Sequence, residues 1–163
     1  TKSPDFPVSS GAIKGTYAGG NSDGFIMKFD LKSNKPVYST YIGGSKSDRL
    51  KTISKTGKQK YILVGASGSQ DFPVTENALY SSIDSGMDLV ILILDKQLRK
   101  IDYSTYGGGS RQIVMDPVST YIHGGKLLIS SLCFSPDFSA TLIYAEPETT
   151  GTNCIWKFNL NEL

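Results

Sequence analysis

The sequence predicts an all-β fold built from small antiparallel sheets that repeat along the chain. The tetrapeptide Asp5-Phe6-Pro7-Val8 returns as Asp71-Phe72-Pro73-Val74 and, with changes, as Asp137-Phe138-Ser139-Ala140, at a constant spacing. Tyr38-Ser39-Thr40-Tyr41 returns as Tyr103-Ser104-Thr105-Tyr106 at almost the same spacing. Repeats at a fixed period indicate copies of one supersecondary unit that bury their faces by stacking on each other. No segment has apolar residues at helical spacing over the roughly 10 residues that a helix needs.

Strands are predicted from alternating hydrophobicity, β-branched and aromatic residues, and Gly or Asn at the turns. The middle repeat shows four, at 48–56, 60–67, 88–95 and 100–106. Matching apolar runs predict strands at 23–30 and 153–160; the Tyr38 to Tyr41 segment and the sequences on either side of the 123–125 turn supply the rest. The run 87–94 is almost wholly apolar but too short for a membrane span of about 20 residues. We therefore expect this strand to be buried on both faces.

Four strands per unit, with apolar residues on both faces, are typical of a β-propeller blade, because each blade lies between two others. With strands labelled A to D from the inside out, the chain begins with C and D, continues with A to D, and ends with A, B and C. These nine strands make about two and a quarter blades, whereas a closed ring needs at least about four.

The predicted organisation is one partial propeller domain over residues 1–163. It comprises a half blade with its preceding loop (1–47), a complete blade (48–110) and a three-stranded last blade (111–163). We expect the chain to be the C-terminal part of a larger propeller, so that its first partner is the remainder of that propeller. Self-assembly of short chains into a ring remains the alternative.

The string from Asp71-Phe72-Pro73-Val74 through the Asp88 strand to Tyr103-Ser104-Thr105-Tyr106-Gly107-Gly108 resembles the bacterial β-propeller repeat known as SBBP. The consensus of that repeat runs DFP, then D-x-F-x-x-K, then YSTYLGG. Residues 5–50 match best, and the third copy keeps only Asp137-Phe138 and the Trp156 strand. The resemblance implies a seven-bladed or similar propeller in secreted or surface proteins of bacteria, and hence an extracellular or cell-surface location.

The repeated motifs favour an architectural role. In the long connections, Asp5, Asp71 and Asp137 are expected to accept backbone N–H groups, while Pro7 and Pro73 restrict the backbone angle φ. Phe6, Phe72 and Phe138 would fill the gaps between adjacent blades. In the Tyr-Ser-Thr-Tyr strands, the tyrosines should pack and the hydroxyl groups should face solvent or cross-strand partners. Ligand or cation contacts by these Asp residues, and stacking of a sugar on these Tyr residues, remain open alternatives.

Charge and cysteine content give little indication of partners. With 17 basic and 15 acidic residues the net charge is +2, which argues for neither nucleic acid nor membrane insertion. Cys133 and Cys154 lie on neighbouring predicted strands, and both a disulfide and buried free thiols stay open. We expect no metal or cofactor, because no Cys/His spacing suggests zinc and the residues Asp23, Asp84 and Asp88 lack the alternating ligands of a calcium loop, although a structural calcium site stays an open alternative.

The residues also give little support to catalysis. His123 is the only histidine and lies in a predicted turn, and no G-x-S-x-G elbow accompanies the serines around it. The third copy departs from the repeat pattern at 141–152, where Glu146 and Glu148 lie, either as a specialised ligand loop or as the drift expected of a terminal blade.

Two functional classes remain. The first is a non-catalytic module that acts as a binding or adhesion scaffold, or as a spacer, and presents its loops to a glycan or a surface protein. In that case Tyr17, Tyr80 and Tyr144, in the connections between strands B and C, are candidate aromatic platforms. The second is part of a carbohydrate-active lyase or hydrolase whose site lies mostly outside this chain. The regularity of the repeat favours the first class, because a catalytic face requires residues that break the repeat.

Overall fold

The computed structural model describes residues 1–83, 86–107, 114–133 and 152–160, and these residues form strands, turns and loops but no helix. The strands are β1 (Gly24–Asp30), β2 (Lys35–Ile42), β3 (Asp48–Lys55), β4 (Tyr61–Ser67), β5 (Asp88–Leu94), β6 (Ile101–Tyr106), β7 (Val114–His123), β8 (Lys126–Cys133) and β9 (Thr152–Asn159). The all-β prediction is confirmed. The strands predicted as ranges begin and end within one residue of the observed ones.

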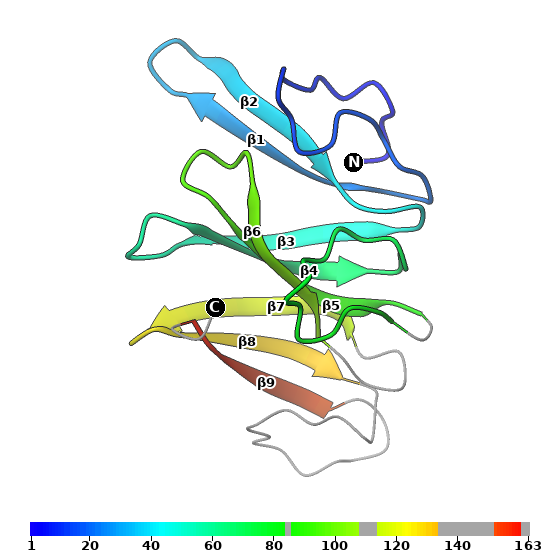
Figure 1. Cartoon of the computed structure of the whole chain (residues 1–163), viewed down its shortest axis with the longest axis vertical. Helices are drawn as coiled ribbons and strands as arrows, with labels where there is room; N and C mark the ends of the chain where they lie inside the picture. Colours follow the sequence, from blue (N-terminus) through cyan, green and yellow to red (C-terminus); the bar gives the residue numbers. More distant parts are fainter. Residues whose placement is uncertain (84–85, 108–113, 134–151, 161–163) are drawn as a thin grey trace.

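The strands form three antiparallel sheets, with the orders β1-β2, β3-β4-β5-β6 and β7-β8-β9. Figure 1 shows the sheets one above another along the long axis of the molecule. The first sheet contacts the second through β1 and β3, and β7 of the third sheet contacts β3, β4 and β5. The four-stranded sheet therefore lies between the other two.

Two apolar cores fill the two layers between the sheets. The core between the first and second sheets contains Ile26, Tyr38, Ile42, Leu63, Phe72, Ile83, Val90, Leu92, Leu94, Leu98 and Tyr106. The core between the second and third sheets contains Ile62, Val64, Leu89, Ile91, Ile93, Tyr103, Leu127 and Ile129. Each such side chain contributes about 1.5–3 kcal/mol when it leaves water.

Strand β5 contributes to both cores, because successive side chains of a strand point to opposite faces of the sheet. Leu89, Ile91 and Ile93 face the third sheet. The alternate residues Val90, Leu92 and Leu94 face the first sheet, and no side chain of the strand is more than 7% exposed. The prediction that this apolar run is buried on both faces is confirmed.

The long connection between β4 and β5 folds back along β6. Thr75 N donates to Ser104 O (3.1 Å), and Tyr106 N donates to Tyr80 O (3.1 Å). The segment before β1 makes the same contacts with β2, through Ser9, Ser39, Lys14 and Tyr41. An uncovered edge strand is a template for pairing with other chains. The connections therefore cover one edge of the first and of the second sheet.

The prediction for the hydroxyl groups of the Tyr-Ser-Thr-Tyr strands was that they face solvent or cross-strand partners, and this covering excludes the first alternative. Their hydroxyl groups do not face solvent, because the serines and threonines are at most 4% exposed. Thr105 Oγ1 accepts a hydrogen bond from Tyr80 N (2.9 Å), and Thr40 Oγ1 accepts one from Lys14 N (3.0 Å). The threonine hydroxyl groups therefore bind the backbone of the covering connection, which lies far away in the sequence. Ser104 Oγ, by contrast, is buried without a hydrogen-bond partner among the described residues.

The Asp-Phe-Pro-Val motif packs on the last tyrosine of the same strands. Phe72 is 3% exposed, and its ring centroid lies 6.1 Å from that of Tyr106. Tyr106 Oη donates to Ser69 O (2.5 Å), and burial raises the pKa of this tyrosine to about 12. Phe6 and Tyr41 form the equivalent pair in the first repeat, at 5.4 Å. Asp137 and Phe138 lie outside the described residues.

Candidate functional site

The two candidate tyrosines that the structure describes lie on opposite sides of the first sheet. Tyr80 is half-buried and packs against the core between the first and second sheets. Tyr17 lies on the other side, edge-on to Tyr41 at 6.1 Å, and its hydroxyl group donates to Gly20 O (3.0 Å). Tyr17 and Tyr80 therefore share no surface. Tyr144 lies outside the described residues.

A pair of buried carboxylates, which the sequence did not reveal, lies where the first and second sheets meet. Asp23 precedes β1 and Asp48 begins β3, and each is 1% exposed. A Cβ atom on Gly43 would lie 2.8 Å from Asp48 Oδ2 and 3.0 Å from Asp23 Oδ1. Both carboxylates therefore face the backbone of Gly43, and only glycine leaves them room.

The two carboxylates differ in their hydrogen bonds. Asp48 Oδ2 accepts from Gly44 N (2.7 Å) and from Ser69 Oγ (2.8 Å), and Asp48 Oδ1 accepts from the hydroxyl group of Ser67. Asp23 Oδ2 accepts from Ala18 N (2.6 Å), but Asp23 Oδ1 is buried without a hydrogen-bond partner in the described part of the chain. The Asp48 carboxylate is thus held by several donors, whereas that of Asp23 is under-satisfied.

The electrostatics of the pair follow from burial. Desolvation raises the pKa of both carboxyl groups, because burial disfavours the charged form, and the charge of Asp23 adds to the rise at Asp48. Lys14 opposes the rise at Asp23, and its ammonium group donates to Gly43 O (2.8 Å). Paired carboxyl groups with raised pKa values have the chemistry for proton transfer.

The motif residue Asp71 lies next to this pair but has a structural role. Its Oδ1 accepts hydrogen bonds from Ser45 N (2.7 Å) and Ser45 Oγ (2.9 Å), and the bond from Ser45 N lowers the pKa of Asp71. The Asp-Phe-Pro-Val loop is thereby tied to the Gly43-Gly44-Ser45 segment between β2 and β3. Asp5, by contrast, accepts from the hydroxyl group of its near neighbour Ser3.

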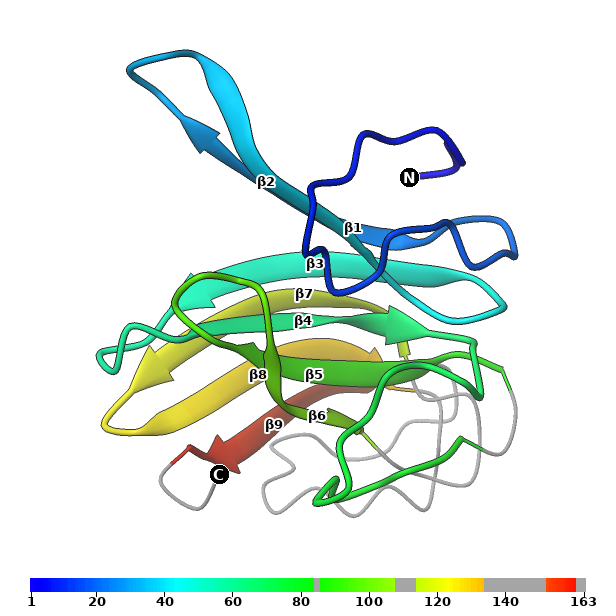
Figure 2. The same cartoon turned by 45° about the horizontal axis from the view of Figure 1, so that its top comes forward.

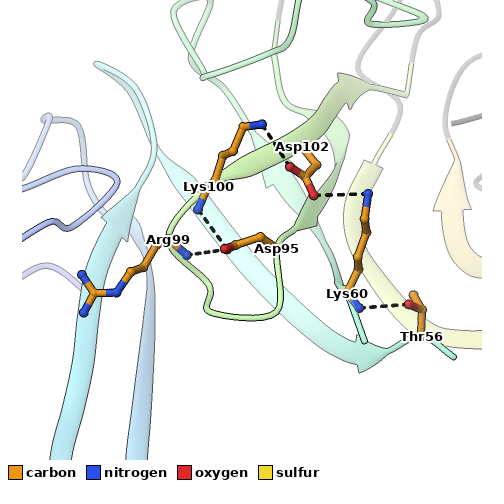
Figure 3. A network of polar contacts seen from close by, with 6 residues as sticks. All are labelled: Thr56, Lys60, Asp95, Arg99, Lys100 and Asp102. Atoms are coloured by element: carbon orange, nitrogen blue, oxygen red, sulfur yellow. Dashed lines mark hydrogen bonds and ion pairs between the residues drawn. The ribbon is translucent and has the colours of Figure 1, made fainter. Parts of the chain in front are cut away.

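A groove between the second and third sheets is lined in part by Lys58 and Lys60, which follow β3. Ile62, Ile93, Ile122 and Leu160 are among the residues that line its volume of about 240 Å³. Beside it, Asp102 pairs with Lys60 at 3.2 Å and with Lys100 at 3.5 Å, as Figure 3 shows. These lysine side chains are 42% and 76% exposed, and exposed ion pairs contribute at most about 1 kcal/mol.

Figure 3 also shows how the turn between β5 and β6 is held. Asp95 Oδ1 accepts from Arg99 N (2.7 Å) and from Lys100 N (3.1 Å). The guanidinium carbon of Arg99 lies 4.7 Å from the ring centroid of Tyr38, and Arg99 Nη1 donates to Ser10 O (3.0 Å). This turn of the second sheet is thereby attached to the first repeat, and its polar side chains have structural contacts.

The outer face of the first sheet, which carries Phe25, Met27 and Phe29, differs from the equivalent face of the second sheet. Phe25 and Phe29 are 45% and 48% exposed. Their counterparts in the second repeat, Val90 and Leu94, are fully buried against the first sheet. The same side of the repeat is therefore a covered face in the second sheet and an uncovered apolar face in the first.

The described residues contain no group of three or more His, Cys, Asp or Glu side chains placed to hold a metal ion. Asp88 Oδ1 accepts from Leu89 N (2.7 Å), and Asp84 lies outside the described residues.

The backbone register pairs Cys133 with Thr152 and Ser131 with Cys154, so the cysteines occupy diagonal positions on adjacent strands. No helix long and apolar enough to cross a membrane occurs in the described ranges.

Comparisons of the chain with protein-family models, with curated proteins and with solved structures found no match.

Proposed function

We propose that this chain is part of a β-propeller and acts as a non-catalytic scaffold or binding module. The observation that carries the proposal is the uncovered outer face of the first sheet. Its apolar residues correspond to residues that the second sheet buries against a neighbouring sheet. The outer face is therefore suited to pack against a further blade, supplied by the remainder of the propeller or by another copy of the chain.

The use of the repeated polar residues supports a scaffold. Asp71 binds the loop before β3, and the buried threonines of the Tyr-Ser-Thr-Tyr strands bind the covering connections. These side chains hold one segment to another, and the threonine contacts occur at equivalent places in two repeats. A catalytic face would need chemically reactive side chains that are free to meet a substrate.

The outer face can be tested in solution. The double variant Phe25→Ser/Phe29→Ser removes apolar surface that is about half exposed, so it should not unfold the chain. We expect the unmodified chain to bind an apolar fluorescent dye or to self-associate in light scattering, and the double variant to do markedly less of either. Leu31→Ser is the matched control, because Leu31 is 90% exposed and its counterpart, Lys96, is not apolar.

The resemblance to the SBBP repeat extends this proposal to an extracellular or cell-surface location in a bacterium, with a glycan or a surface protein as the ligand. Antibody detection on intact cells and in culture fluid tests the location. Finding the protein only inside the cells would overturn this part of the proposal. A monomeric chain that binds no dye would overturn the propeller itself, because the outer face would then need no partner.

In the alternative function, the chain is part of a carbohydrate-active enzyme with a propeller fold. The observation that favours this alternative is the pair of buried carboxylates of Asp23 and Asp48. Glycoside hydrolases use two carboxyl groups, one of which needs a raised pKa. Turnover of polysaccharides by the whole protein, lost in Asp23→Asn, would establish this alternative. Binding of a glycan without turnover would support the scaffold.

A further inference from the structure

We infer that the edge of β1 that faces away from β2 is a binding site for an antiparallel β-strand with the chemistry of β4. The inference rests on the blade architecture of the proposed function and concerns an edge, whereas the proposed function concerns a face. The strand that fits is uncharged, with consecutive aliphatic side chains followed by small residues, as in Ile62-Leu63-Val64-Gly65-Ala66. The recognition is the addition of a strand to an open sheet edge.

The first argument is the register of the second sheet. Strand β5 pairs with β6 on one side and, from Tyr61↔Leu94 to Ser67↔Asp88, with β4 on the other. Strand β1 is the counterpart of β5, and it pairs with β2 as β5 pairs with β6. In the described part of the chain, no strand takes the place of β4 beside β1.

The second argument is that Thr1 already occupies the last position of such a strand, the place that Ser67 takes at the end of β4. Asp23 N donates to Thr1 O (2.9 Å), and the amino group of Thr1 donates to Asp23 O (2.6 Å). The equivalent pair in the second repeat is Ser67 with Asp88. The likeness extends to the next turn, because Ser3 N donates to Thr1 Oγ1 (3.0 Å) as Ser69 N donates to Ser67 Oγ (3.1 Å).

A strand in line with Thr1 would run along β1 in a groove that the structure shows. The groove has a volume of about 460 Å³ and lies between the start of β1 and β3. Gly24 and Phe25 line it on one side, and Leu50 lines it on the other. Lys2, Arg49 and Lys51 also line the groove. Because like charges repel, these cations disfavour a basic strand, and β4 has no charged residue.

The test adds such a strand to the intact chain. Copying the Tyr61–Ala66 sequence of β4 directly in front of Thr1 reproduces the spacing between β4 and its following loop. We expect hydrogen exchange of the backbone amides in residues 24–30 to slow by at least 10-fold, with a rise of the melting temperature. A Gly/Ser extension of the same length is the first control. The second is the copied strand with proline in place of the residue copied from Leu63, since proline removes a backbone donor.

The outcomes separate this inference from the proposed function. Slower exchange with the copied strand, and not with either control, supports strand binding at the β1 edge. Equal exchange in all three extended chains overturns it, as does protection of residues 24–30 by self-association of the unextended chain. If the Phe25→Ser/Phe29→Ser variant shows no loss of dye binding or association while the copied strand still protects β1, the proposed function fails and the edge site stands.

Discussion

Gly44 shows at the scale of single residues why the repeat motifs occur together. A Cβ atom at this position would lie 2.4 Å from Asp71 Oδ1 and 2.5 Å from Ser69 Cβ. The glycine of one repeat is thus fixed by the Asp-Phe-Pro-Val loop of the next. A sequence pattern shows that both motifs recur, but it does not show that they touch, because Ser45 and its partner Asp71 are 26 positions apart.

We predict that Gly44→Ala destabilises the protein by about 1–3 kcal/mol, the usual cost of overpacking a filled site. Backbone and side-chain atoms must move to admit the methyl group, and the hydrogen bonds of Asp71 to Ser45 are lost with them. Gly57→Ala is the matched control, because no atom lies within 4 Å of the Cβ position at Gly57. Urea unfolding of both variants measures the difference, and equal stabilities would refute the close contact at Gly44.

A second residue-scale prediction concerns the pH dependence of Asp23. Burial raises the pKa of Asp23 in the folded protein, so the folded state binds a proton more tightly than the unfolded chain. This group therefore contributes stability that is fully present below its unfolded pKa near 3.8 and is lost as pH rises through the folded value. We expect Asp23→Asn to be at least as stable as the unmodified chain at pH 7.

Unfolding of the two proteins between pH 3 and pH 7 isolates this contribution. Asp5, Asp30 and Asp71 have lowered pKa values and act in the opposite direction, so only the difference between the two proteins is informative. Asp48 also faces this site and has a raised pKa, but it is present in both. A difference in stability that does not grow in favour of Asp23→Asn with rising pH would contradict the prediction.

At the scale of elements, the sequence predicted the positions of the strands well, but it did not predict which loops cover the edges of the sheets. Period-two alternation indicated β3 and β6, aromatic and β-branched residues indicated β4, and the unbroken apolar run of β5 predicted burial on both faces. These are local signals, and each strand carries its own. The covering of β6 by the loop before β5 was missed, because its hydrogen bonds join residues 24–29 positions apart and serine and threonine suit solvent equally well.

The candidate site was predicted less well than the fold for the same reason. Asp23 and Asp48 were each visible as a polar residue at the start of an apolar run, which is a common place for Asp. Nothing in one repeat indicated that the two carboxylates meet at Gly43, since they belong to different sheets. The tyrosine platforms were predicted from loop position alone, and their placement depends on which side of the sheet each loop packs.

The matched phenylalanines of the repeat motif give a prediction at this scale. Phe72→Ala should cost about 3–5 kcal/mol, because Phe72 is fully packed between the first two sheets and its removal leaves a cavity. Phe6→Ala should cost clearly less, because Phe6 is only half-buried against the uncovered outer face. Chemical unfolding of both variants measures the contrast. Equal costs would mean that another part of the chain covers Phe6 in solution.

At the scale of the whole molecule, the described residues form a short stack of three sheets, in which the second sheet contacts both the first and the third. Such repeat assemblies gain stability from the interfaces between adjacent units. The second sheet has an interface on both faces, and the first has one. Figure 2 shows the turn end of the β1–β2 hairpin pointing away from the second sheet, so this hairpin has support only near its base.

We therefore predict a gradient of hydrogen exchange along the stack, because local opening is easiest where few apolar contacts are lost. Amides of β4 and β5 should exchange slowest, with protection close to that of global unfolding. Amides of β1 and β2 near the Asp30 to Lys35 turn should exchange at least 10-fold faster. Mass spectrometry of peptides from both regions measures the rates. Equal protection of the two sheets would show that the outer face of the first sheet is already covered in solution, and the mass of the complex would then identify the partner.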